Sequence, residues 1–147
     1  MTSQRKSEGS LNGKGESSQW LIKAADLYRA NMVWKLFGTS ASGQRLIEGL
    51  SSPNENVRTL AGMFLVQSGR KAIPLLEHEL ENRRNMPLVL TMLGDIGAAE
   101  SEGKLRRHLD DSDPEAAKAA NEALRALLFK QKMDSSANME SQRPPKE

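Results

Sequence analysis

The chain has 147 residues, with 21 Lys and Arg against 19 Asp and Glu, two histidines and no cysteine. This length favours a single domain. A net charge of +2 does not indicate a strongly basic nucleic-acid binder, and without cysteine the chain has no disulfide framework, thiolate metal site or cysteine nucleophile. No apolar run is long enough to span a membrane, and the N-terminus lacks the apolar core of a secretory signal. We therefore expect a soluble, cytoplasmic protein.

Apolar residues are unevenly distributed along the chain. Residues 1–17 and 131–147 together hold 5 apolar residues in 34 positions, whereas residues 18–130 hold about 50 in 113. Segments so poor in apolar residues cannot bury enough surface to offset the loss of conformational entropy on folding. We expect one folded domain at 18–130 between two disordered tails, 1–17 and 131–147.

The folded segment is predicted to be all-α. Val, Ile and Thr together number only 12, whereas Leu, Ala, Glu, Lys and Arg dominate, which favours helices over strands. Apolar residues recur at spacings of three and four, and in chain order this spacing predicts helices near 18–37, 46–50, 57–65, 73–80, 88–96, 105–109 and 116–127. Residues 33–37 either continue the first of these helices or begin a second one. Helices this short are not stable alone, so we expect each to pack on its neighbours.

The later helices repeat in pairs. Leu50, Leu80 and Leu109 each precede a polar turn and are 30 and 29 residues apart. The first and third turns contain Ser-x-x-Glu, at 52–55 and 112–115, which is the spacing of a capping box at a helix start. This regularity predicts a helical repeat with a period of about 30 residues.

The second helices of the pairs also align. A shift of 28 places Leu65 on Leu93 and Gly69 on Gly97, and a shift of 59 places Leu65 on Leu124. Gly69 and Gly97 would end their helices, where a residue able to adopt positive φ is favoured. Turns, caps and core positions that agree in this way predict a helical solenoid.

The sequence resembles a known repeat. LGDIG at 93–97, DDSDPEA at 110–116 and AAxxAL at 119–124 resemble HEAT-like repeats of the phycobilisome-lyase type, and the resemblance covers about residues 40–130. It implies a short right-handed α-solenoid of about three stacked helix pairs, which 18–37 would cover as an N-terminal helical cap. The sequence departs from the repeat pattern at two places: Arg58 is matched by Ala117, and the middle turn lacks Asp-Pro. We therefore do not expect equivalent side chains to form a regular ladder along the solenoid.

Residues that could carry catalysis are sparse. His78 and His108 lie among charged residues and show no metal-binding spacing, so we interpret them as surface side chains. The carboxylates have helix-pair or cap explanations, such as Glu79 four residues before Arg83 and Glu102 four before Arg106. We therefore expect neither an enzyme nor a metal or cofactor site.

The favoured hypothesis is a non-catalytic protein-protein interaction or scaffold module. Its partner, another protein, would bind on the face lined by the second helices, around 55–68, 85–97 and 114–129. The candidate partner-binding residues combine an apolar, methionine-containing patch with nearby arginines. They are Arg58, Met63, Val66, Arg83, Arg84, Met86, Leu90, Arg106 and Arg107.

Two alternatives remain open at this stage. The resemblance implies that the chain could be an accessory subunit in the attachment of bilin chromophores to phycobiliproteins, or in their detachment. A basic patch formed by Arg83, Arg84, Lys104, Arg106 and Arg107 could instead bind a nucleic-acid backbone. We do not expect a membrane or a small-molecule substrate as partner.

Overall fold

The computed structural model describes residues 12–142, with side chains from residue 18 onward. Every regular element in this range is helical, and the range contains no strand. The order is α1 (Asn12–Phe37), α2 (Ser40–Gly49), α3 (Glu55–Gln67), η1 (Gly69–Ala72), α4 (Ile73–Glu81), α5 (Met86–Ile96), η2 (Ala99–Ser101), α6 (Glu102–Arg107) and α7 (Pro114–Ser141). The prediction of an all-α protein is confirmed for the described residues. None of these helices combines the length and the apolar character that a membrane crossing requires.

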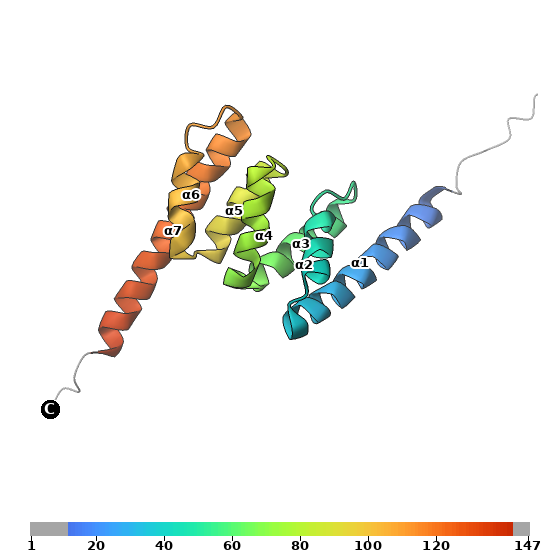
Figure 1. The fold of residues 1–147 in the computed structure, drawn as a ribbon, viewed down its shortest axis with the longest axis horizontal. Coiled ribbons are helices and arrows are strands. Elements are labelled where there is room, and N and C mark those ends of the chain that lie inside the picture. The colour runs from blue at the N-terminus through green and yellow to red at the C-terminus, as the bar shows by residue number, and fades with distance from the viewer. Residues whose placement is uncertain (1–11, 143–147) are drawn as a thin grey trace, which may run out of the picture.

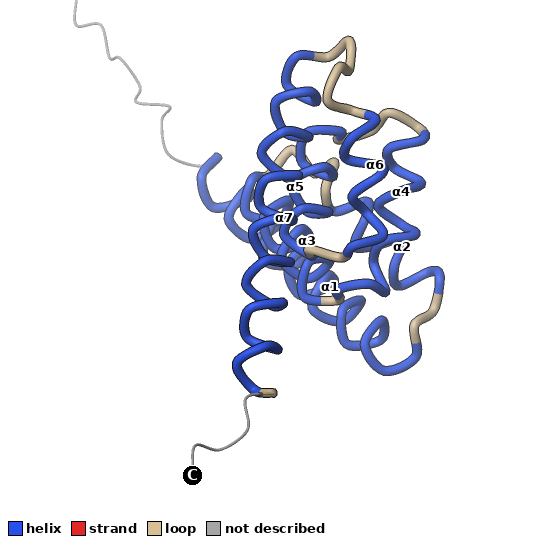
Figure 2. Tube along the Cα trace, turned by 90° about the vertical axis from the view of Figure 1, so that its left-hand side faces the viewer, coloured by secondary structure: helices blue, strands red, loops and turns tan. Residues whose placement is uncertain are grey.

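The helices form two layers. Figure 2 shows α2, α4 and α6 on one side and α3, α5 and α7 on the other. Within the pairs, α2 contacts α3, α4 contacts α5, and α6 contacts α7; between pairs, α3 contacts α5 and α5 contacts α7. Helix α1 contacts both α2 and α3 and lies at one end of the row, with α7 at the other end (Figure 1).

The core follows the alignment of the second helices. Leu65, Leu93 and Leu124 are all buried, as the shifts of 28 and 59 predict. On α7 the buried face is rich in alanine, so that α5 can approach closely: a Cβ added at Gly94 would lie 2.7 Å from the Cα of Ala123. The alanines of α7 therefore allow a tight crossing of two neighbouring second helices.

The helix starts differ from the predicted capping boxes. The N-caps are Asn54 and Asp113, whose side chains accept from the backbone N–H groups of Val57 and Glu115. Ser52 instead lies before the cap, where its Oγ accepts from the backbone N–H of Asn54 at 3.2 Å. The capping-box prediction was wrong by two residues in the first turn and one in the third, because Asn and Asp compete with Ser as N-caps.

Two helix ends are capped by a lysine from another element. Helix α1 ends before Gly38 at φ +62°, and Lys71 Nζ donates to the carbonyl of Trp34 while lying 4.6 Å from the centroid of its ring. Helix α5 ends at Gly97 with φ +69°, and Lys130 Nζ donates to two carbonyls of the last turn. Both lysines place positive charge at the negative end of a helix dipole.

Parts of the two predicted disordered tails are helical in the structure. Residues 12–17 belong to α1, and α7 continues as helix through 131–141 instead of stopping at 130. Residues 115–142 contain neither Gly nor Pro, so nothing in the sequence breaks the helix once it has formed. The remaining parts of the predicted tails, 1–11 and 143–147, lie outside the described residues.

Candidate functional site

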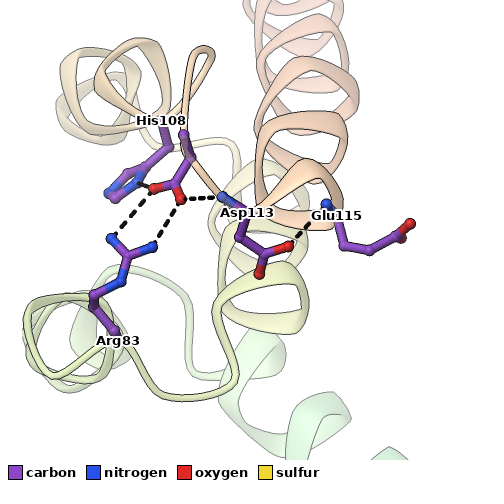
Figure 3. Close-up of polar contacts among 5 residues, drawn as sticks. Arg83, His108, Asp113 and Glu115 are labelled. Carbon is purple, nitrogen blue, oxygen red and sulfur yellow. Dashed lines mark hydrogen bonds and ion pairs between the residues drawn. The ribbon is translucent and has the colours of Figure 1, made fainter.

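The turns within the three helix pairs lie along one edge of the molecule (Figure 1). At this edge, Arg83 Nη2 donates to Asp111 Oδ1 at 2.8 Å, which joins the second turn to the third. The Nδ1 of His108 lies 2.9 Å from Asp111 Oδ2, and the backbone N–H of Asp113 donates to Asp111 Oδ1 at 3.0 Å. Figure 3 shows Arg83 and His108 converging there, and the cap bond between Asp113 and Glu115 beside them.

These contacts favour the charged forms of Asp111 and Arg83. The hydrogen bond from Arg83, followed by those from the backbone of Asp113 and the side chain of His108, holds the pKa of Asp111 well below its usual range. The same hydrogen bond and the negative charge of Asp111 raise the pKa of Arg83. The ion pair therefore persists at neutral pH.

The first and second turns are joined in a similar way. Asn85 Nδ2 donates to Ser51 Oγ at 2.9 Å. Asn85 and Arg83 both adopt positive φ, at 49° and 52°, which directs their side chains toward opposite neighbouring turns. Asn tolerates this conformation, whereas Arg adopts it at an energetic cost. The structure thus places Arg83 in a contact between turns.

Most of the predicted basic residues have carboxylate partners. Arg84 pairs with Glu79 at 2.6 Å, Arg106 with Glu102 at 2.8 Å, and Lys104 with Glu77 at 2.7 Å; among these, the predicted pair of Glu102 and Arg106 is confirmed.

The predicted pair of Glu79 with Arg83 was wrong, because α4 ends at Glu81 and Arg83 turns away with positive φ. Arg58 donates to the carbonyls of Ser52 and Pro53 in the first turn. Arg107 is exposed and forms no ion pair within the described residues.

Two of the predicted apolar contact residues are buried. Met86 is 4% exposed and Leu90 is fully buried, so their prediction as partner-binding residues was wrong. Helix α5 packs against α3, α4 and α7, so these three neighbours together cover more of its apolar surface than a single neighbour would. Val66 is partly buried against the core, whereas Met63 is 44% exposed as predicted.

The exposed large apolar side chains are confined to one set of helices. Within residues 18–142 they all lie on α1, α3, α5 and α7, and none lies on α2, α4 or α6. They are Leu21, Ile22, Tyr28, Met32, Val33, Leu36, Phe37, Met63, Leu88, Leu128, Phe129, Met133 and Met139. Sequence reasoning missed Leu88, which belongs to the apolar stripe of its helix, and missed Phe129 and Met133 at the boundary of the predicted tail.

A groove of about 730 Å³ lies between α1 and the α2–α3 pair. Its lining includes Ile22, Ala25 and Arg29 of α1, Arg45 and Glu48 of α2, and Val57 of α3. The guanidinium of Arg45 donates to both carboxylate oxygens of Asp26 across this junction, at 2.9 and 3.1 Å. No residue pattern indicates this groove, which lies where α1 diverges from α2 and α3 (Figure 1).

The two histidines are part of local surface contacts. His78 is exposed and lies 4.0 Å from Glu81, and His108 belongs to the Asp111 contact described above. Within residues 18–142, no three His, Asp or Glu side chains converge so that they could hold a metal ion.

Comparison of the chain with protein-family models, with curated proteins and with solved structures finds no match.

Proposed function

We propose that the protein is a non-catalytic protein-interaction module, and that its partner binds the exposed layer formed by α3 and α5 together with α1. The observation that supports this proposal is the confinement of exposed large apolar side chains to α1 and the second helices. Side chains of this kind in exposed positions favour contact with another protein, because their burial releases water from apolar surface. Among the described residues, the first helices α2, α4 and α6 lack such side chains.

We define the second-helix surface by Tyr28, Met63 and Leu88, which are 54%, 44% and 37% exposed. The ring of Tyr28 packs edge-on against that of Phe64, with centroids 5.0 Å apart, which places Tyr28 of α1 against α3. Aromatic and methionine side chains are enriched where proteins bind one another, since they bury much area and adapt to irregular partners.

We also propose that the pairs α2–α3, α4–α5 and α6–α7 form a short right-handed solenoid of HEAT-like repeats. Three features support it: buried residues at equivalent positions of the second helices, turns along a common edge, and side-chain hydrogen bonds between successive turns. A solenoid of this kind presents one helix layer as an extended surface, which agrees with the proposed mode of binding.

The nucleic-acid alternative loses support from the ion pairs. Arg83, Arg84, Arg106 and Lys104 each pair with a carboxylate, so most of the predicted basic patch is neutralised before any phosphate could bind. The proposal of an accessory role in bilin attachment rests on the sequence resemblance alone.

The test is affinity purification from the native host with wild type and two double variants. Met63→Glu with Leu88→Glu introduces charge on the second-helix surface, and we expect it to abolish capture of the partner. Gln44→Glu with His78→Glu introduces the same charges at exposed positions of the first-helix layer and is the matched control. Circular dichroism checks that both variants are folded. Loss of the partner from the control and its retention by the Met63 and Leu88 variant would refute the proposed surface.

A further inference from the structure

The C-terminal part of α7 is a helix without a partner. Every residue from 132 to 142 is exposed, and the side-chain hydrogen bonds of this segment, such as Ser135 to the carbonyl of Gln131 and Ser136 to that of Lys132, stay within it. Figure 1 shows it extending beyond α5 and α6, away from the body of the protein. An isolated helical extension of this length is marginal in water, so a surface that packs against it would stabilise it.

An apolar stripe runs along α7 into this extension. Ala126, Phe129, Met133 and Ala137 follow one another at spacings of three, four and four residues, which places them on one face of the helix. Phe129 is 67% and Met133 is 56% exposed. Glu140, three residues after Ala137, continues the same face and forms no ion pair within the described residues. The face is therefore apolar with a negative charge at its end.

The groove at the other end of the molecule has complementary properties. Ile22 is 70% exposed and lines it together with Leu27 and Val57. Lys23 and Arg29 also line it, and neither forms an ion pair with another described residue, whereas Asp26 is already paired with Arg45. Even with the carboxylate of Glu48, the unpaired charges of the groove sum to +1. An apolar helix face that ends in a carboxylate fits this lining.

We propose that the α7 extension of one copy binds, in a second copy, the groove between α1 and the α2–α3 pair. The two features lie at opposite ends of the row of helices (Figure 1), so α7 cannot reach the groove of its own chain. The contact joins two different surfaces and is heterologous, so that each copy presents one free groove and one free extension. It uses neither Met63 nor Leu88, and is independent of the second-helix surface.

Sedimentation of the full chain over a wide range of concentration tests this proposal. We expect wild type to associate as concentration rises, and Met133→Glu to weaken association by about tenfold or more. Met139→Glu is the matched control, because Met139 is equally a methionine of this segment, is 76% exposed and lies off the stripe. On α1, Ile22→Glu should weaken association, and Leu36→Glu should not, although both side chains are 70% exposed.

Two mixing experiments distinguish a heterologous contact from other self-association. Copies with Ile22→Glu keep an intact extension, and copies with Met133→Glu keep an intact groove, so an equimolar mixture should form a heterodimer while each variant alone stays monomeric. Because the chain has no cysteine, Ile22→Cys and Met133→Cys in separate copies should form one disulfide-linked dimer under mild oxidation, and Leu36→Cys with Met139→Cys should not. A wild type that stays monomeric at every concentration, or variants that do not complement each other, would overturn the proposal.

Discussion

Arg83 in the α4–α5 turn and Asp111 in the α6–α7 turn form an ion pair of 2.8 Å between residues 28 positions apart. The carboxylate of Asp111 is almost completely covered, with 6% of its side chain exposed, and also accepts from the backbone of its own turn. The ion pair thus fixes the position of the α4–α5 turn relative to the α6–α7 turn. The α4–α5 and α6–α7 turns are therefore held together by this contact and not only by the apolar core.

We predict that Asp111 makes the stability of the protein depend on pH. Its pKa is lowered in the folded state by the hydrogen bond from Arg83, so the ionised form stabilises the fold. This contribution is fully present above the unfolded-state pKa of about 4 and is lost progressively as pH falls below it.

Asp111→Asn should therefore unfold at lower urea concentration than wild type at pH 7, and the difference should shrink as pH is lowered below about 4. Urea titrations at several pH values, followed by circular dichroism, measure this. Asp95→Asn is the control, since the Asp95 side chain is exposed and forms no ion pair within the described residues. A difference between wild type and Asp111→Asn that stays constant with pH would contradict the assignment.

A second prediction concerns Glu79, which is 2% exposed and pairs with Arg84 at 2.6 Å. Arg84→Met removes the cation and leaves the buried carboxylate without its partner, so we expect a loss of about 1–3 kcal/mol in the free energy of unfolding. Arg84→Met combined with Glu79→Leu removes both charges and should recover most of that loss. Chemical denaturation of Arg84→Met, Glu79→Leu and the double variant measures the interaction free energy between the two side chains. Strictly additive losses in the free energy of unfolding would contradict this prediction.

The ion pairs of Arg83 and Arg84 affect how the proposed partner-binding surface can be tested. Arg83 and Arg84 were predicted to bind a partner, and charge reversal at both positions is the obvious experiment. Because Arg83 pairs with Asp111 and Arg84 with Glu79, such a variant would lose stability as well as charge. Failure to capture a partner would then report unfolding, so the exposed apolar residues of the second-helix surface are the better targets.

The helices could be predicted from the sequence because each buries an apolar stripe with helical spacing. Leu50, Leu80 and Leu109, predicted to close the first helices, lie within two residues of the ends of α2, α4 and α6. The length of α7 could not be predicted in this way. Residues 132–141 are all exposed, and their helix continues because no Gly or Pro ends it.

The candidate site was less accessible to sequence reasoning. Periodicity identifies the apolar face of a helix but not the number of helices that cover it, which is why Met86 and Leu90 were misplaced. The rule that pairs Glu79 with Arg83 assumes that the helix continues, whereas Arg83 has positive φ beyond its end. Contacts between turns depend on backbone geometry that no residue pattern in this chain specifies.

A third prediction concerns Lys130, whose Nζ donates to the carbonyls of Asp95 and Ile96 at 3.2 and 3.3 Å. These carbonyls belong to the last turn of α5, where a positive charge interacts favourably with the helix dipole. Lys130→Met keeps much of the aliphatic chain and removes the charge, so we expect a loss of about 0.3–1 kcal/mol in stability. Lys132→Met, in the exposed extension of α7, is the matched control. Thermal unfolding of the two variants at low and high salt measures these losses. Equal losses for Lys130→Met and Lys132→Met would show that Lys130 contributes only through the net charge of the protein.

Two glycines in the interior of second helices should respond oppositely to replacement by alanine. A Cβ at Gly94 would lie 2.7 Å from the Cα of Ala123, at the crossing of α5 and α7, and the backbone there cannot move without separating the helices. Gly94→Ala should therefore destabilise the protein by about 1–3 kcal/mol. At Gly62 the nearest atom to a new Cβ is the sulfur of Met92 at 3.6 Å, an ordinary contact.

Because alanine loses less conformational entropy than glycine in a helix, Gly62→Ala should stabilise the protein by about 0.5–1 kcal/mol. Each variant is the other's control, since the chemical change and the type of secondary structure are the same. Urea denaturation of both should move their midpoints in opposite directions from wild type. Equal shifts of the two midpoints would mean that α5 and α7 do not cross as closely as the contact between Gly94 and Ala123 requires.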